Sequence, residues 1–136
     1  NPTIIVYAMT DELNNPTMIF LYFAIAAMTI AFDTLYGLCD IDDDKKLGIN
    51  STPIWWGSNT LKIVACFQSM AIFLLLIVGW QAGLKFIWFL GVIFLIGFYI
   101  HQHHLANQKK YFLAFKNNHW ASFYLLMLSV LCFLII

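Results

Sequence analysis

The chain has 136 residues, of which 62% are hydrophobic, 18% aromatic and only 10% charged. A soluble globular domain carries roughly 25% charged residues, so this composition argues against one and favours a membrane protein. Seven basic residues balance seven acidic residues, and the net charge of zero leaves no basic field to attract a nucleic-acid backbone. We therefore expect an integral membrane protein, with the lipid bilayer as its surroundings and no nucleic acid among its ligands.

Four apolar stretches follow one another along the chain, at residues 17–38, 61–80, 84–100 and 120–136. Each is close to the length of about 20 residues that a helix needs to cross roughly 30 Å of hydrocarbon. Asn15 and Pro16 before the first stretch are typical of a helix start. The sequence therefore predicts an all-α membrane protein with about four transmembrane helices, forming one domain over residues 1–136.

Lysines predict the orientation of these spans. Six of the seven lie in or beside the two longer polar segments, 39–60 and 101–119: Lys45, Lys46, Lys62, Lys109, Lys110 and Lys116. Positively charged loops stay on the cytoplasmic side of a membrane. Both longer polar segments are therefore expected to be loops on that side.

Acidic residues gather where the first span ends, since five of the seven lie between Asp33 and Asp44. If the helix continues past residue 38, then Asp33, Tyr36, Gly37, Asp40 and Asp44 lie on one face. Repulsion between like charges on a helix costs roughly 0.2–0.5 kcal/mol per pair, and an aspartate near hydrocarbon costs more, so a compensating cation is expected. Mg²⁺ suits this face because it binds one or two carboxylates and completes its shell with waters and substrate phosphates.

Besides a magnesium–diphosphate site, the acidic segment has two other interpretations, a calcium-binding EF-hand loop and a solvated acidic loop. An EF-hand loop starting at Asp40 fails, because Lys45 stands where glycine is needed and Ser51 where the bidentate glutamate is needed. A solvated acidic loop explains Asp42 and Asp43 as well as a metal site does. We favour the metal site for Asp40 and Asp44, and both interpretations stay open for Asp33, Asp42 and Asp43.

The residues from Lys46 to Pro53 have two interpretations, one as helix ends and caps and one as ligands of a phosphate. Gly48 is expected to end a helix, and Ser51 or Thr52 to cap the next one, with Pro53 in its first turn. The same hydroxyl groups and amides are suited to meet a phosphate. Lys46 either neutralises a diphosphate or marks the membrane interface.

Two segments resemble a known family. FDTLYG at 32–37, DIDDD at 40–44, Lys46, GI at 48–49 and ST at 51–52 together resemble YDTxYAxxDxDDDxKxGIKST, the second aspartate-rich motif of the UbiA-type intramembrane prenyltransferases. Within the family, the pattern is most similar to the 4-hydroxybenzoate polyprenyltransferases of ubiquinone synthesis. FLAFKNNHW at 112–120 resembles the family's FxAFxNNxW segment. The chain is therefore expected to align with the C-terminal part of these enzymes.

The resemblance implies a bundle of nine transmembrane helices in the bacterial inner or mitochondrial inner membrane, with a cavity open to the cytoplasm or matrix. It implies Mg²⁺-dependent transfer of a polyprenyl group from polyprenyl diphosphate to the ring of 4-hydroxybenzoate. By position, Asp40, Asp43 and Asp44 match metal ligands, and Asp40, Asp44 and Tyr36 match catalytic positions. The diphosphate-binding positions implied are Asp33, Lys46, Ser51 and Thr52.

This sequence departs from the family pattern in several places. The first aspartate-rich motif, NDxxDxxxD, does not occur in it, so we expect a fragment or split half that is inactive alone and needs an N-terminal half carrying that motif. Asn50 replaces a lysine, Gly37 an alanine, and Pro53–Trp56 departs from AxLFG. The alternative is a non-catalytic membrane protein for cation binding, transport or assembly, or a prenyltransferase acting on another aromatic acceptor.

Three further groups are given structural roles. His101, His103 and His104 are expected at the membrane interface. Trp80, Trp88 and Trp120 lie near span ends, as interface anchors do. Asn117 and Asn118 are expected to cap the last helix.

Overall fold

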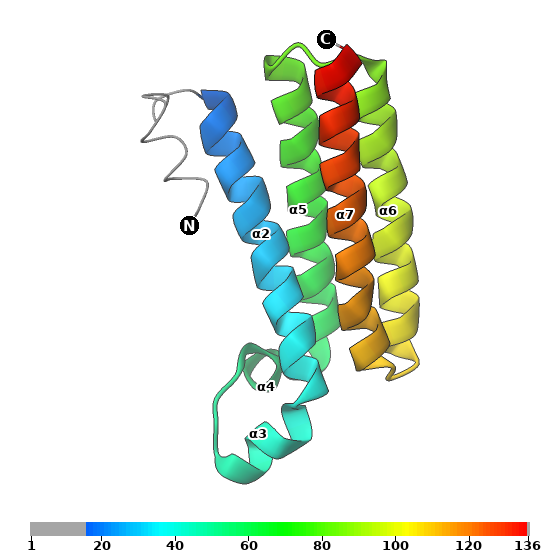
Figure 1. Cartoon of the computed structure of the whole chain (residues 1–136). Coiled ribbons are helices and arrows are strands. Elements are labelled where there is room, and N and C mark those ends of the chain that lie inside the picture. Colours follow the sequence, from blue (N-terminus) through cyan, green and yellow to red (C-terminus); the bar gives the residue numbers. More distant parts are fainter. Residues whose placement is uncertain (1–15, 136) are drawn as a thin grey trace.

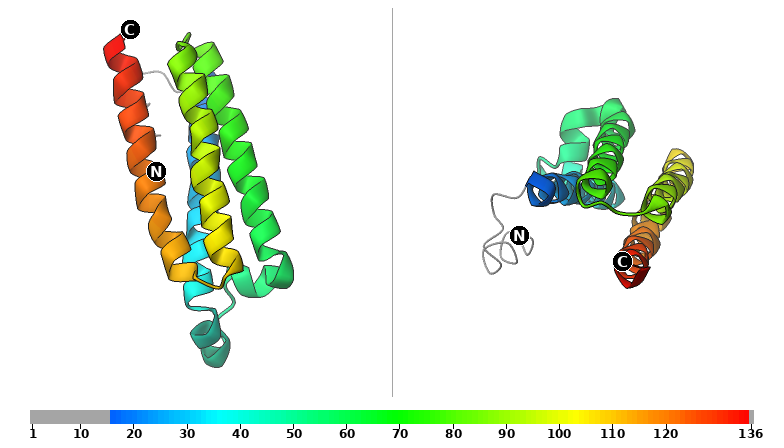
Figure 2. Two further views of the ribbon diagram at one scale, coloured as in Figure 1. Left: turned by 90° about the vertical axis from the view of Figure 1, so that its right-hand side faces the viewer. Right: turned by 90° about the horizontal axis from the view of Figure 1, so that it is seen from above.

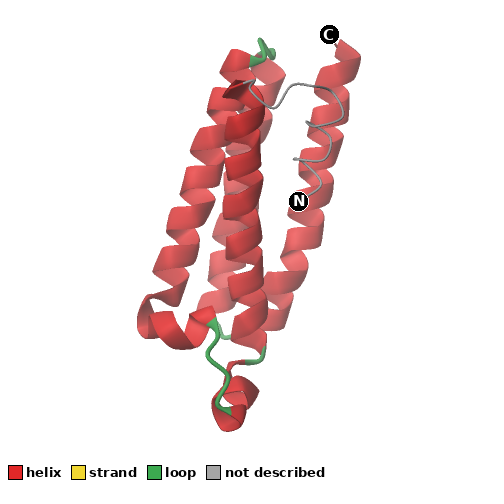
Figure 3. Ribbon diagram, turned by 90° about the vertical axis from the view of Figure 1, so that its left-hand side faces the viewer, coloured by secondary structure: helices red, strands yellow, loops and turns green. Residues whose placement is uncertain are grey.

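The structure, a computed structural model, describes residues 16–135 and is built of helices joined by short loops (Figure 3). Its long helices are α2 (Pro16–Cys39), α5 (Thr60–Gln81), α6 (Phe86–Asn107) and α7 (Tyr111–Ile135). Two short helices, α3 (Ile41–Leu47) and α4 (Thr52–Trp56), and the 3-10 turn η1 (Gly57–Asn59) join α2 to α5. The expectation of an all-α protein is confirmed over the described residues.

The long helices lie side by side and alternate in direction, so that the α2–α5 and α6–α7 connections fall at one end of the bundle (Figure 1). We call this the loop end: it carries α3, α4 and the turn at 108–110 between α6 and α7. A view from another side gives the same arrangement (Figure 2). The two lysine-rich segments therefore lie at the same end, as the positive-inside argument requires.

Three helical runs have the length and hydropathy of membrane-crossing helices: Pro16–Cys39, Pro53–Gln81 and Phe86–Asn107. The expected spans at 17–38, 61–80 and 84–100 are therefore confirmed as long apolar helices. α7 is not among the candidate spans found in the described part of the chain. It begins at Tyr111 rather than near residue 120, and its first half carries Lys116, Asn117 and Asn118.

Small side chains form the buried face of α2. Ala24, Ala27 and Ala31 are at most 2% exposed, and their spacing places them on one side of the helix. Small residues let membrane helices approach closely, and α2 packs on both α5 and α7. The helix α6 packs on the same two neighbours, and the buried apolar side chains form two clusters, a larger one that includes Leu75, Trp88 and Leu95 and a smaller one around Leu35 and Val64.

The polar segment 101–119 is not a loop, contrary to expectation. α6 continues to Asn107 and α7 begins at Tyr111, which leaves only residues 108–110 between them. Three polar side chains of this segment, Gln102, His103 and Asn117, make hydrogen bonds to groups on other helices. Asn117 lies within α7 and does not cap it, and its Nδ2 donates a hydrogen bond to the Phe98 carbonyl oxygen over 3.0 Å.

Trp88 is also placed differently from the expectation. Its side chain is 5% exposed and its indole Nε1 donates to the Leu75 carbonyl oxygen over 3.0 Å, so it ties α6 to α5 rather than anchoring the chain at the interface. Gly79 makes this possible, because a Cβ there would lie 2.2 Å from Trp88 Cδ1. Trp80 and Trp120, by contrast, are mostly exposed, as interface anchors are.

Candidate functional site

The acidic segment is divided between two helices. α2 ends at Cys39, Asp40 adopts a backbone conformation of φ −108° and ψ 10°, and α3 follows. The expectation of one continuous helical face through Asp44 is therefore wrong at Asp40. The backbone nevertheless keeps the two aspartates one turn apart, because the Asp44 N–H donates to the Asp40 carbonyl oxygen over 2.9 Å.

The carboxylates of this segment have no ionic partners within the described residues. Asp33, Asp40, Asp42 and Asp43 are exposed and Asp44 is half-buried. No group of three His, Cys, Asp or Glu side chains gathers closely enough among residues 16–135 to hold a metal ion. Mg²⁺ commonly takes only one or two protein carboxylates, so the donor chemistry of Asp40 and Asp44 fits this ion without a three-residue cluster.

The connection from α3 to α4 forms as the sequence predicts. Gly48 ends α3 in the left-handed conformation, with φ 71°, and the Ile49 N–H donates to the Asp44 carbonyl oxygen over 2.9 Å. Ser51 occupies the N-cap position of α4, but its hydroxyl makes no capping hydrogen bond. Its Oγ is buried and has no hydrogen-bond partner in the described part of the chain. Thr52 opens α4, and its side chain lies outside the described residues.

Two departures from the family pattern meet at one contact. Pro53 is fully buried, and a Cβ on Gly37 would lie only 2.9 Å from Pro53 Cγ and 3.1 Å from its Cδ. Glycine in α2 therefore makes room for the proline at the start of α4. The two substitutions amount to one packing change beside Asp40.

An aromatic cluster formed by Phe32, Tyr36 and Phe115 joins α2 to α7 near the loop end. The Phe115 ring centroid lies 4.8 Å from that of Phe32 and 5.1 Å from that of Tyr36. Tyr36 is 54% exposed, and its spacing from Asp33 places both residues on the same side of α2. The cluster therefore adjoins the first aspartate of the motif.

A groove of about 490 Å³, the α2/α7 groove, runs beside this cluster. Its polar lining is Thr29, Gln68, Tyr99, Asn118, Ser122 and Ser129, and its apolar lining includes Leu21, Ile25, Phe32, Leu75, Trp88 and Leu125. Asn118 Nδ2 is buried and has no partner among the described groups. The groove is therefore lined by both apolar and polar side chains, and Phe32 of the aromatic cluster is one of them.

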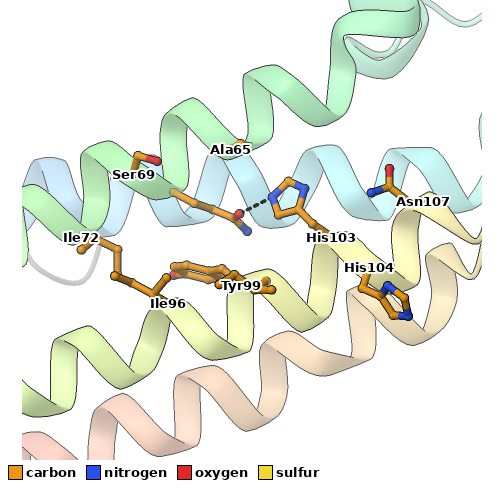
Figure 4. Close-up of a pocket in the computed structure, with 10 residues that line it drawn as sticks. Ala65, Ser69, Ile72, Ile96, Tyr99, His103, His104 and Asn107 are labelled. Atoms are coloured by element: carbon orange, nitrogen blue, oxygen red, sulfur yellow. Dashed lines mark hydrogen bonds between the residues drawn. The ribbon is translucent and has the colours of Figure 1, made fainter.

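A second groove of about 600 Å³, the α5/α6 groove, lies between those two helices (Figure 4). His103 points across it, with Nε2 2.7 Å from Gln68 Oε1. Gln68 Nε2 in turn donates to Gln102 Oε1, and Gln102 Nε2 donates to the Ala114 carbonyl oxygen over 2.9 Å. His103 is half-buried and bonded within the bundle, whereas His101 and His104 are exposed.

Sequence reasoning missed this buried polar chain. Gln68 and Gln102 are 4% and 1% exposed, which is rare for glutamine unless its amide is satisfied. Gln102 stands among histidines in the polar segment 101–119, and only Gln68 is signalled in the sequence, as a strongly polar residue inside an otherwise apolar helix. Such a residue is by default a functional candidate in a membrane protein, but its partner cannot be read from one sequence.

Long apolar helices with a carboxylate-rich connection at one end define a helical membrane protein. Residues 2–126 match the family described as the UbiA prenyltransferase family, and the chain belongs to this family.

The relatives that it matches carry a more specific name. The 4-hydroxybenzoate octaprenyltransferase of Marinobacter nauticus is 38% identical over 119 residues, covering 85% of this chain and 40% of that protein. The protein of the same name from Shewanella halifaxensis is 40% identical over 111 residues, covering 79% of this chain and 39% of that protein. The chain thus spans about 40% of the length of these relatives. No solved structure matches it.

Proposed function

We propose that this chain forms the second aspartate-rich part of an enzyme that transfers a polyprenyl group from polyprenyl diphosphate to the ring of 4-hydroxybenzoate. The observation that carries the proposal is the pair Asp40 and Asp44, held one turn apart at the loop end with no ionic partner among residues 16–135. The similarity to proteins named 4-hydroxybenzoate octaprenyltransferase supports the choice of acceptor. The loop end would face the cytoplasm or the matrix.

The carboxylates would bind the metal and the diphosphate. Asp40, Asp43 and Asp44 are the residues that would hold Mg²⁺, with diphosphate oxygens and water as its other ligands. Bound Mg²⁺ would supply positive charge that stabilises the departing diphosphate. The exposed Lys46 and the unpartnered hydroxyl of Ser51 lie in the same connection and would donate to diphosphate oxygens.

The neighbouring residues would shield the reaction from water. The bond between the first prenyl carbon and the diphosphate oxygen breaks, a bond from that carbon to the ring forms, and the ring loses one proton. The aromatic cluster of Phe32, Tyr36 and Phe115 presents ring faces that attract the allylic cation. The apolar part of the α2/α7 groove would hold the isoprenoid chain and exclude water.

The experiment uses a chimera, because the chain spans about 40% of its relatives. This chain replaces the matching part of the Marinobacter nauticus protein, and the rest of that protein is expected to supply the first aspartate-rich motif. In membranes given octaprenyl diphosphate, 4-hydroxybenzoate and Mg²⁺, Asp40→Asn and Asp44→Asn should each lower turnover by about 100-fold or more, since loss of a charge-stabilising group costs on the order of 2.7–4 kcal/mol.

Asp42→Asn is the matched control, because Asp42 lies in the same helix and is exposed. It should keep most of the activity. Normal turnover in both the Asp40 and Asp44 variants, with the chimera folded, would contradict the proposal. Turnover with homogentisate or dihydroxynaphthoate but not with 4-hydroxybenzoate would retain the chemistry and reject the acceptor.

A further inference from the structure

The polar chain between α7 and the α5/α6 groove has a fixed direction. A backbone carbonyl can only accept hydrogen bonds, so the contact with Ala114 must be made by the amide nitrogen of Gln102. The Gln102 oxygen then faces Gln68, which must donate with its own nitrogen and turn its oxygen toward His103. One group of fixed polarity thus sets the orientation of both amides.

This direction also places a hydrogen atom on one ring nitrogen of His103. Its Nε2 contacts an acceptor oxygen, so Nε2 must carry a hydrogen atom. In the neutral ring the other nitrogen, Nδ1, is then a hydrogen-bond acceptor. No described residue donates to Nδ1. His103 lines the α5/α6 groove, so Nδ1 is the ring nitrogen that this side chain has left to accept a hydrogen bond from a ligand.

The lining of the α5/α6 groove changes from polar to apolar along the bundle (Figure 4). His103, His104 and Asn107 lie toward the loop end, where α6 ends. The remaining lining residues extend into the bundle, and most are apolar: Ala65, Gln68, Ser69, Ile72, Ile96, Tyr99 and Ile100. A groove of about 600 Å³ is large enough for a small molecule. Its gradient matches an amphiphile with its headgroup at the loop end.

A positive charge lies beyond the polar end of the groove. Lys62 is exposed in the first turn of α5, and its spacing from Ala65 and Ser69 places it on the same side of that helix. A headgroup seated beside His103 would thus have a cation nearer the loop end. The groove therefore combines an internal acceptor, an external cation and an apolar passage.

We propose that the α5/α6 groove binds the prenylated 4-hydroxybenzoate formed by the reaction, with its phenol hydroxyl donating to His103 Nδ1. This inference rests on the proposed function, because that reaction makes the ligand. The hydroxyl group directs the prenyl cation to the adjacent ring carbon, since the opposite carbon carries the carboxylate. The hydroxyl group and the prenyl chain are therefore attached on one side of the ring, and the carboxylate is attached on the opposite side. In the bound product the carboxylate points toward Lys62, and the prenyl chain lies along Ile96 and Ile100.

The fixed polarity disfavours a phosphodiester group facing His103 Nδ1. A phosphodiester offers only acceptor oxygens, and two acceptors facing each other repel. A phenol provides the missing donor and also stacks on an aromatic side chain such as Tyr99, which lines the groove.

The test uses two probes and needs no turnover. The purified full chain in nanodiscs is titrated with radiolabelled 3-geranyl-4-hydroxybenzoate and with its methyl ether, 3-geranyl-4-methoxybenzoate, which lacks the donor. The phenol should bind about tenfold more tightly than the ether, the size of one buried hydrogen bond. His103→Phe should weaken binding of the phenol to the level of the ether. His101→Phe, an exposed position on the same helix outside the groove, should keep the tenfold difference.

Equal affinity for the two probes in the unmodified chain would overturn the inference, whether or not His103→Phe folds. A tenfold preference that persists in a folded His103→Phe variant would also overturn it, because the donor would then bind elsewhere. These results are separate from the chimera assay. Turnover of the chimera without probe discrimination would reject this groove and leave the proposed function standing.

Discussion

The contact between Gly37 and Pro53 allows a quantitative test of how α2 and α4 pack beside the acidic segment. A methyl group at position 37 would lie 2.9 Å from Pro53 Cγ, whereas carbon atoms prefer about 3.5–4.0 Å, so the two helices must separate by roughly 0.6–1 Å. Overpacking of this kind costs about 1–3 kcal/mol. Alanine regains up to about 1 kcal/mol of helix propensity over glycine. Gly37→Ala is therefore expected to destabilise the chain by about 0–2 kcal/mol.

The matched control is Gly97→Ala in α6, where an added Cβ meets nothing within 4 Å. That variant should be more stable by up to about 1 kcal/mol, because alanine has a higher helix propensity than glycine and its added methyl group meets no neighbouring atom. Unfolding of each variant is followed by circular dichroism in detergent. A Gly37→Ala/Pro53→Ala double variant should be more stable, by about 1–3 kcal/mol in the free energy of unfolding, than the sum of the two single changes predicts. The packing argument is refuted if Gly37→Ala is as stable as Gly97→Ala and the double variant shows no coupling.

Two further predictions concern hydrogen bonds between the long helices, measured by the same unfolding experiment. Trp88→Phe should lower the free energy of unfolding by about 1–3 kcal/mol, because it leaves the buried Leu75 carbonyl without its indole donor. Trp80→Phe, at an 81% exposed position, should leave the free energy of unfolding nearly unchanged. Equal effects of the two changes would contradict the role given to Trp88. Gln102→Leu should lower the free energy of unfolding by about 1–3 kcal/mol, because Gln68 Nε2 loses its acceptor. Adding Gln68→Leu to this variant should cost less than Gln68→Leu costs alone. Strictly additive effects of the two changes on the free energy of unfolding would show that the two amides do not act together.

The features that sequence predicts well are local. Three of the four expected spans follow from apolar length alone, and each appears as a long helix: α2 and α5 keep close to their expected bounds, whereas α6 continues to Asn107. The left-handed end of α3 at Gly48 and the position of Ser51 before Pro53 follow from turn chemistry within a few residues. The family assignment rests on short motifs at 32–52 and 112–120 and is confirmed by the match to residues 2–126.

Features set by contacts between distant residues were not predicted. Asn117 looked like a cap because its partner, the Phe98 carbonyl, lies on another helix. Trp88 looked like an interface anchor because its position near a span end is visible in the sequence, whereas its contact with Leu75 is not. Polarity predicted a loop at 101–119, but Gln102 and Asn117 are satisfied by hydrogen bonds inside the bundle.

The candidate site is predicted in part by local sequence and depends in part on contacts between distant residues. Residue types and spacing single out Asp40 and Asp44, and the backbone keeps them one turn apart although the helix breaks between α2 and α3. The joint change at Gly37 and Pro53 could not be predicted, because each departure is unremarkable until the two residues are found in contact. The roles of the aspartates in binding metal stay predictions.

The most direct test of the proposed function is the metal-dependent turnover of the unmodified chimera with the Marinobacter nauticus protein. Membranes containing it are incubated with octaprenyl diphosphate and 4-hydroxybenzoate, with Mg²⁺ or with excess chelator, and the products are identified by mass spectrometry. The proposed function predicts octaprenylated 4-hydroxybenzoate with Mg²⁺ and none with chelator. A folded chimera that forms no prenylated product, while the intact Marinobacter nauticus protein does so under the same conditions, would contradict it.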